Sequence, residues 1–166
     1  MEKHFKLCGL DEYKCIICKE KILKINLEEH VKNQCIFRIS YYSNGDRYEG
    51  EFKNGKKEGI GIYNFSNGHR YKGEFKNDLI EGYGISYYSN GNRYEGEFKN
   101  GKKEGIGIYY ISDGHKYEVE WKNDFADGYG IVYYSDGNRY EGEFKNDKKE
   151  GYGVFYFSDG SRYEGK

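Results

Sequence analysis

Residues 94–109 read YEGEFKNGKKEGIGIY, and this stretch decides the fold because most of the chain consists of copies of it. The same string occupies residues 48–63. Looser or shortened copies begin at Tyr71, Tyr117, Tyr140 and Tyr163. The starting tyrosines are 23 residues apart throughout, which gives five tandem units. A period of this length is typical of an array or solenoid and not of a globule with one central core. We therefore expect a repeated surface to carry the function.

The composition agrees with a repeated β structure. The 166 residues include 24 Gly, 20 Tyr and no Pro, with 36% hydrophobic residues and a mean hydropathy of -1.04. Disorder would fit such a hydropathy, but 19% aromatic residues and a strict period oppose it. The absence of Pro fits backbone donors that are committed to strand ladders.

Charge and hydropathy argue against nucleic-acid binding and against a membrane-spanning or secreted protein. The net charge is -1, from 27 basic and 28 acidic residues mixed through the chain, so we expect no nucleic-acid partner. No stretch approaches the 18 apolar residues of a membrane helix, and the N-terminus lacks an apolar signal core. We expect a cytoplasmic location, either free or associated with the cytoskeleton or a membrane.

The N-terminal segment, residues 1–38, carries a candidate metal site. Cys15 and Cys18 form a C-x2-C pair, His30 follows after eleven residues, and Cys35 follows after four more. Two thiolates from a tight turn and two ligands from a following helix would complete a tetrahedral Zn²⁺ site. Reduced cysteines in a small helical cap are the alternative.

This pattern resembles the Cys-Cys-His-Cys zinc fingers, including the ubiquitin-binding type, in which a short hairpin precedes one helix (ββα). The four-residue gap from His30 to Cys35 departs from that pattern and places Cys35 just past the helix end. The resemblance implies a metal-held finger that could bind ubiquitin, contact another protein or cap the sheet.

Each repeat of residues 39–166 predicts two strands joined by hairpins. Asn-Gly and Asp-Gly pairs, which tolerate a positive φ, separate the strands, with residues 54–57 expected as one such loop. Alternation along the first strand points Tyr94, Gly96 and Phe98 to one face and the charged residues between them to the other. Recurring strand glycines, such as Gly105 and Gly107, indicate that an aromatic ring from a neighbouring strand lies over them.

The odd repeat length adds a constraint on the connections. Equivalent residues of successive units face the same way only if one connection holds an even number of residues and the other an odd number, or if a bulge intervenes. We expect the odd connection or the bulge to lie beside a glycine.

The repeated string resembles the MORN repeat (membrane occupation and recognition nexus) over residues 48–162, with half a unit before it. The resemblance implies a mainly β fold, in which repeated hairpins form one elongated, twisted antiparallel sheet about 50 Å long. Val119 and Trp121 depart from the Tyr-x-Gly-x-Phe pattern, so ring-on-glycine packing is in doubt in the fourth unit.

A second period of 46 residues appears in the loops. Lys-Lys pairs at 56–57 and 102–103 alternate with apolar pairs at 79–80 and 125–126. Duplication of a two-unit block explains this alternation, and so does an apolar ridge that meets a partner. The candidate partner-binding residues are Leu79, Ile80 and Phe125 in the loops and Tyr94, Phe98 and Trp121 on the aromatic face.

We expect no enzyme. The Gly-x-Gly elements lack the following helix and Lys-Ser/Thr of a phosphate loop, and the glutamate ladders lack a cleft. The leading hypothesis is a non-catalytic protein-interaction scaffold. Peripheral binding to anionic lipid and ubiquitin binding through the finger are the alternatives. An unpaired last strand near Tyr163 also makes homodimerisation an expectation.

Overall fold

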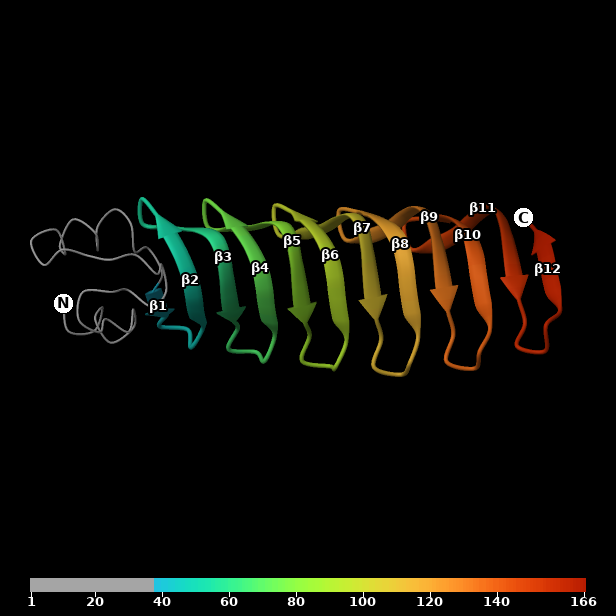
Figure 1. The fold of residues 1–166 in the computed structure, drawn as a ribbon, viewed down its shortest axis with the longest axis horizontal. Coiled ribbons are helices and arrows are strands. Elements are labelled where there is room, and N and C mark those ends of the chain that lie inside the picture. Colours follow the sequence, from blue (N-terminus) through green and yellow to red (C-terminus); the bar gives the residue numbers. More distant parts are fainter. Residues whose placement is uncertain (1–37) are drawn as a thin grey trace, which may run out of the picture.

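The computed structural model describes residues 38–166, which form one antiparallel sheet of twelve strands in sequence order (Figure 1). The strands are β1 (Arg38–Tyr41), β2 (Arg47–Lys53), β3 (Lys56–Asn64), β4 (Arg70–Lys76), β5 (Leu79–Tyr87), β6 (Arg93–Lys99), β7 (Lys102–Tyr110), β8 (Lys116–Lys122), β9 (Phe125–Tyr133), β10 (Arg139–Lys145), β11 (Lys148–Tyr156) and β12 (Arg162–Gly165). The predicted single meander is confirmed. The predicted finger lies outside the described residues, and no helix in the described part is long and apolar enough to cross a membrane.

Two kinds of connection join the strands. Within a unit, two residues with positive φ make a tight hairpin, as at Asn100 (φ 51°) and Gly101 (φ 78°). The expected four-residue loop was wrong, because Lys56 and Lys57 already belong to β3. Between units, five residues connect the strands, as from Phe65 to His69, whose backbone N–H and C=O bond at 2.9 Å. The predicted even and odd pair of connections is therefore confirmed.

A bulge interrupts every within-unit hairpin beside a glycine. Gly96 pairs with Gly107, but the next residue, Glu97, pairs with Glu104, so Gly105 and Ile106 are extra residues on β7. Gly105 has a φ of 62°, which a side chain would strain. The expectation that a ring covers Gly105 was wrong, because the Glu97 carboxylate occupies that space. Gly105 provides the positive φ of the bulge, and Gly107 leaves space for the Tyr94 ring.

The core is a layer of rings on one face of the sheet, which we call the ring face. Tyr94 is fully buried, and a Cβ added at Gly107 would meet its ring at 2.6 Å. The Tyr94 hydroxyl donates a hydrogen bond to the Glu97 carbonyl at 3.0 Å. The predicted ring-over-glycine packing is thus confirmed, and it gives a single sheet a core without a second layer.

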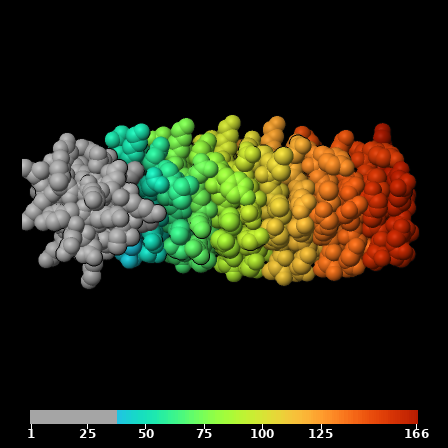
Figure 2. All heavy atoms as spheres, in the orientation of Figure 1, coloured from blue at the N-terminus to red at the C-terminus, as the bar shows by residue number. Residues whose placement is uncertain are grey.

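The rings also connect neighbouring units. Tyr94 meets Phe98 of its own strand edge to face, with centroids 5.0 Å apart, and meets Trp121 of the next unit at 5.5 Å. Such edge-to-face contacts are favourable beyond the area that they bury. This ladder runs without interruption from Phe52 to Trp121. The repeats consequently form one elongated body (Figure 2).

The fourth unit departs as its sequence predicts. Val119 fills the space over Gly130 that a tyrosine ring fills elsewhere. Tyr117 is displaced and only partly buried, whereas Tyr48, Tyr71 and Tyr94 are fully buried. Within residues 38–166 no ring pair joins Trp121 to Phe144 of the fifth unit. One substitution therefore breaks the ladder.

Candidate protein-interaction faces

The ring face is largely occupied by its own side chains. The predicted partner residues Tyr94, Phe98 and Trp121 have exposed fractions of 0%, 6% and 6%. Their rings contact one another, and Trp121 Nε1 donates to the Gly107 carbonyl at 3.1 Å. Their role in partner binding stays a prediction, but the structure gives these side chains a packing role.

Lysines of alternate units lie in aromatic cages on the ring face. Lys103 Nζ lies 3.7 Å from the Trp121 ring centroid and 4.7 Å from that of Tyr109. Burial lowers the pKa of Lys103 to about 8, although the rings favour the cation. Ile80 and Ala126 take the equivalent position in the second and fourth units, where they pair with Phe75 and Trp121.

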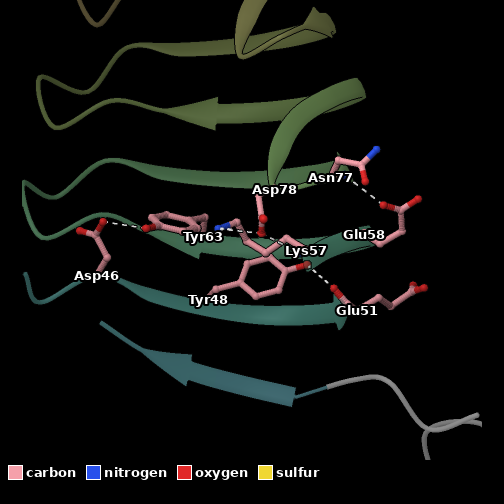
Figure 3. Close-up of polar contacts among 8 residues, drawn as sticks. All are labelled: Asp46, Tyr48, Glu51, Lys57, Glu58, Tyr63, Asn77 and Asp78. Carbon is pink, nitrogen blue, oxygen red and sulfur yellow. Dashed lines mark hydrogen bonds and ion pairs between the residues drawn. The ribbon is translucent and has the colours of Figure 1, made fainter. Parts of the chain in front are cut away.

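The five-residue turns alternate in the same way. Asp46 accepts a hydrogen bond from the Tyr63 hydroxyl at 2.7 Å (Figure 3). It also accepts one from the Ser66 N–H at 2.8 Å. These bonds, led by that from Ser66, lower the pKa of Asp46 to about 2. Two units later, Asn92 contacts the equivalent partners: its Nδ2 donates to the Tyr109 hydroxyl at 2.8 Å, and its Oδ1 accepts from the Ser112 N–H at 3.1 Å.

In the turns that precede the second and fourth units, a histidine replaces this residue. His69 and His115 meet Tyr88 and Tyr134 edge to face at 5.4 and 5.5 Å. The 46-residue period is therefore an alternation of two packing schemes. One scheme uses Asp or Asn with a caged lysine, and the other uses His with Ile or Ala.

The predicted ridge residues divide between the two faces. Leu79 and Phe125 begin β5 and β9 and are each 48% exposed, opposite Lys76 and Lys122. Ile80 packs against the core of the ring face. The prediction that these residues lie in loops was wrong, because each two-residue hairpin loop ends just before Leu79 or Phe125, which is the first residue of a strand.

The opposite face, which we call the charged face, carries an exposed apolar row that is not among the predicted partner-binding residues. Its members are the middle residues of the five Gly-x-Gly elements and are 52–73% exposed: Ile60, Tyr83, Ile106, Tyr129 and Tyr152. Their signal was present, since alternation turns this residue away from the ring that covers the following glycine. The row extends over all five units.

Glutamates alternate with the apolar row. Ile60 pairs with Glu74 and Tyr83 pairs with Glu97 across neighbouring strands. The full set is Glu51, Glu74, Glu97, Glu120 and Glu143. Some of them stabilise the bulge, as when the Tyr83 N–H donates to Glu74 Oε1 at 3.1 Å. Among residues 38–166, none of the five forms an ion pair with a basic side chain.

Basic residues border this band on both sides. On the turn side they are paired with a second line of glutamates, as in Arg139 and Glu141 at 3.0 Å. On the hairpin side, two exposed lysines stand opposite each other in the first, third and fifth units. In the second and fourth units one exposed lysine stands opposite Leu79 or Phe125. These lysines are Lys53, Lys56, Lys76, Lys99, Lys102, Lys122, Lys145 and Lys148.

The hairpin loops of the second and fourth units are each fixed to a strand of the preceding unit, β3 or β7. Asp78 accepts a hydrogen bond from the Lys57 N–H at 2.8 Å, and Glu58 accepts one from the Asn77 N–H at 3.0 Å (Figure 3). Equivalent bonds join Asp124 to Lys103 and Glu104 to Asn123. The rows on the charged face therefore sit on a pre-organised surface.

The predicted zinc ligands Cys15, Cys18, His30 and Cys35 lie outside the described residues, so zinc binding stays a prediction. Within residues 38–166 no group of three His, Cys, Asp or Glu side chains could hold a metal ion.

A cavity of about 620 Å³ lies on the ring face of the last unit, lined by Tyr140, Lys149, Phe155 and Tyr163 among others.

Comparison with known proteins matches the repeats. The family described as MORN repeat matches five consecutive segments, residues 48–70, 71–93, 94–116, 117–139 and 140–162. No curated protein matches the chain.

Solved structures show more distant likenesses. The SAS-4 (dCPAP) TCP domain of Drosophila melanogaster, in complex with a proline-rich motif of Ana2 (dSTIL), is 12% identical over 81% of this chain and 87% of that chain, with a TM-score of 0.48. The TCP10 domain of Danio rerio CPAP, in complex with a STIL peptide, is 16% identical over 78% and 69%, with a TM-score of 0.38. The family match, in contrast, follows the repeats unit by unit.

Proposed function

This chain belongs to the MORN-repeat family, and we propose that it is a non-catalytic scaffold that binds another protein along its charged face. The observation that carries the proposal is the exposed row from Ile60 to Tyr152. Five large apolar side chains in one line, bordered by charged residues, are typical of a surface that another protein covers.

The rigidity of the sheet supports this role. Hydrogen bonds from the hairpin loops to neighbouring strands, together with the ring ladder, hold the row in place before a partner binds. Binding therefore costs little conformational entropy in this protein. The absence of catalysis belongs to the same proposal. The carboxylates of the charged face lie on an open surface, and some accept backbone hydrogen bonds, as Glu74 does.

Affinity capture from native lysate tests the proposal. The bait is the full chain, compared with a variant in which Ile60, Ile106 and Tyr129 are each replaced by Ser. These side chains are more than half exposed, so the variant should fold. A variant with Gln at Lys99, Lys122 and Lys145 is the matched control. We expect the partner to be lost from the first variant and kept by the control; its retention by both would refute the proposal.

Anionic membrane binding is a second candidate, because the eight exposed lysines on the hairpin side border the charged face together with Leu79 and Phe125. Basic side chains beside apolar ones are suited to an anionic lipid surface. Salt-sensitive co-sedimentation with phosphatidylserine vesicles should then disappear in the lysine variant. Absence of co-sedimentation at low salt would remove this candidate.

The remaining predictions keep their own tests. Ubiquitin binding concerns residues 1–38 and is tested by titrating ubiquitin into the zinc-loaded chain. Homodimerisation is tested by sedimentation velocity across a concentration series. A cytoplasmic location is tested by imaging the tagged chain in cells.

A further inference from the structure

We propose that the partner segment is a basic amphipathic α-helix that lies along the long axis of the sheet on the row from Ile60 to Tyr152. This inference rests on the proposed function and specifies its partner. It follows from the spacing of the row, its charge, and the geometry of the elements that could lie on it.

The spacing matches a helix. Equivalent residues of successive units are two strands apart, about 9.6 Å, and a glutamate lies about 4.8 Å from each apolar residue. A helix rises about 1.5 Å per residue, so seven residues cover about 10.5 Å and three residues cover about 4.5 Å, each within about 1 Å of the corresponding distance on the sheet. Positions i, i+3 or i+4, and i+7 share one face of a helix.

An extended segment fits this surface less well. On one face of a β-strand, side chains recur about every 6.6 Å, which matches neither distance. The inner strands β3 to β10 are also hydrogen-bonded on both sides, so an added strand finds no ladder there.

Charge defines the rest of the partner. Each apolar residue of the row is followed by a glutamate that has no basic partner within the described residues, as with Ile60 and Glu74 or Ile106 and Glu120. A complementary helix carries Lys or Arg three or four positions after each apolar residue. An anionic membrane would instead bring negative charge to these carboxylates.

The length of the row sets the length of the helix. Five apolar residues span four intervals of about 9.6 Å, or about 38 Å, which corresponds to about 26 helical residues. The lysines on the hairpin side, such as Lys99 and Lys102, repel a helix that is basic on all sides. The basic residues should therefore follow one stripe.

Synthetic peptides of four seven-residue repeats test the inference against the full chain. The probe has Ile at the first position of each repeat, Lys at the fourth and Ala or Gln elsewhere. One control peptide replaces Lys by Glu, and another has the probe's composition in scrambled order. Fluorescence anisotropy measures affinity, and circular dichroism measures helix content. We expect the probe to bind about tenfold or more tightly than either control, and to gain helix on binding.

Protein variants locate the bound helix. A Tyr83→Ser, Ile106→Ser variant and a Glu74→Gln, Glu97→Gln variant should each weaken probe binding about tenfold or more. The glutamine amide keeps the acceptor that Glu74 offers to the Tyr83 N–H, so the bulge is retained. A Lys99→Gln, Lys122→Gln variant is the control and should not weaken binding.

The outcomes separate this inference from the proposed function. If lysate capture depends on the row but no probe binds, the inference is wrong and the scaffold proposal stands. If capture ignores the row, both fail. Equal binding of all peptides, self-association that Ile106→Ser abolishes, or vesicle binding that Ile106→Ser abolishes would each overturn the inference.

Discussion

Each unit depends on the tyrosine that begins it. Tyr94 covers Gly96 and Gly107, meets rings of two units, and donates its hydroxyl hydrogen to the Glu97 carbonyl. No water reaches this buried hydroxyl in the packed ladder, so the carbonyl is its natural acceptor. One side chain thus provides packing within its unit and contact with the next.

Replacing Tyr94 by Phe should destabilise the protein by about 1 kcal/mol, because the ring remains while the hydrogen bond to Glu97 is lost. The measurement is the midpoint of urea-induced unfolding. Tyr140→Phe is the matched control, since the Tyr140 hydroxyl has no hydrogen bond to residues 38–166, and it should cost less. Equal losses for the two variants would contradict this account of Tyr94.

Asp46 makes stability depend on acid pH. Its pKa is lowered to about 2 in the folded chain, mainly by the Ser66 N–H, against an ordinary value of 3.8. Its stabilising effect is therefore complete above about pH 4 and is lost as the pH falls toward 2.

The Asp46→Asn variant should reproduce the natural arrangement of Asn92, which bonds Tyr109 and Ser112 without a charge. We expect the melting temperature of the wild type to fall more than that of the variant between pH 4 and pH 2. The other carboxylates are common to both proteins and cancel in the comparison. Parallel curves would show that Asp46 does not titrate as proposed.

At the scale of the hairpin, glycines that look alike have different tasks. Gly101 needs a positive φ, and a Cβ there would meet nothing within 4 Å. Gly107 lies in the strand, and a Cβ there would meet the Tyr94 ring. Gly105 needs both a positive φ in the bulge and space for the Glu97 carboxylate.

Gly107→Ala should therefore cost more than Gly101→Ala. We expect on the order of 1–3 kcal/mol for Gly107→Ala, because the ring must move and its hydrogen bond weakens. For Gly101→Ala we expect about 1 kcal/mol, from the left-handed backbone alone. Urea unfolding measures both variants, and the reverse order would mean that conformational strain outweighs ring contact.

At the scale of the whole molecule, residues 38–166 form a line of units in which each contacts only its neighbours within that range. In such an array, stability is carried by the contacts between adjacent units. The ring ladder supplies these contacts from Phe52 to Trp121, and Val119 removes one of them in the fourth unit. The cooperativity of unfolding between neighbouring units should therefore be weaker at the fourth unit.

Hydrogen exchange should reveal this change as a step in protection. Amides of β4 to β7 should exchange more slowly than those of β10 to β12, with the step near β8 and β9, because the ladder is broken there. Exchange resolved by mass spectrometry on peptic peptides measures this. A smooth decline toward the last strand would indicate simple fraying and would contradict a special role for Val119.

Several features of the two faces of the sheet could be predicted from the amino-acid sequence. The alternation of Tyr94, Gly96 and Phe98 identified the ring face, and the odd period identified the two kinds of connection. The exposed row at Ile106 was missed although the same alternation implies it. The sequence also does not distinguish Gly105 from Gly107, because a positive φ and a close contact with a side chain both require glycine.

The sequence by itself determined the period, the hairpins, the single antiparallel sheet and the break at Val119, since each depends on local turn chemistry and on side-chain size at recurring positions. Only the tertiary structure decided which partner each alternating residue meets. Lys103 lies among Tyr94, Tyr109 and Trp121, and Asp46 joins Tyr63 to Ser66, through contacts between strands and turns. The physical reason is register: the bulge and the turns set which side chains of neighbouring strands stand opposite each other, and on the charged face that register brings Ile60 and Glu74 into one row.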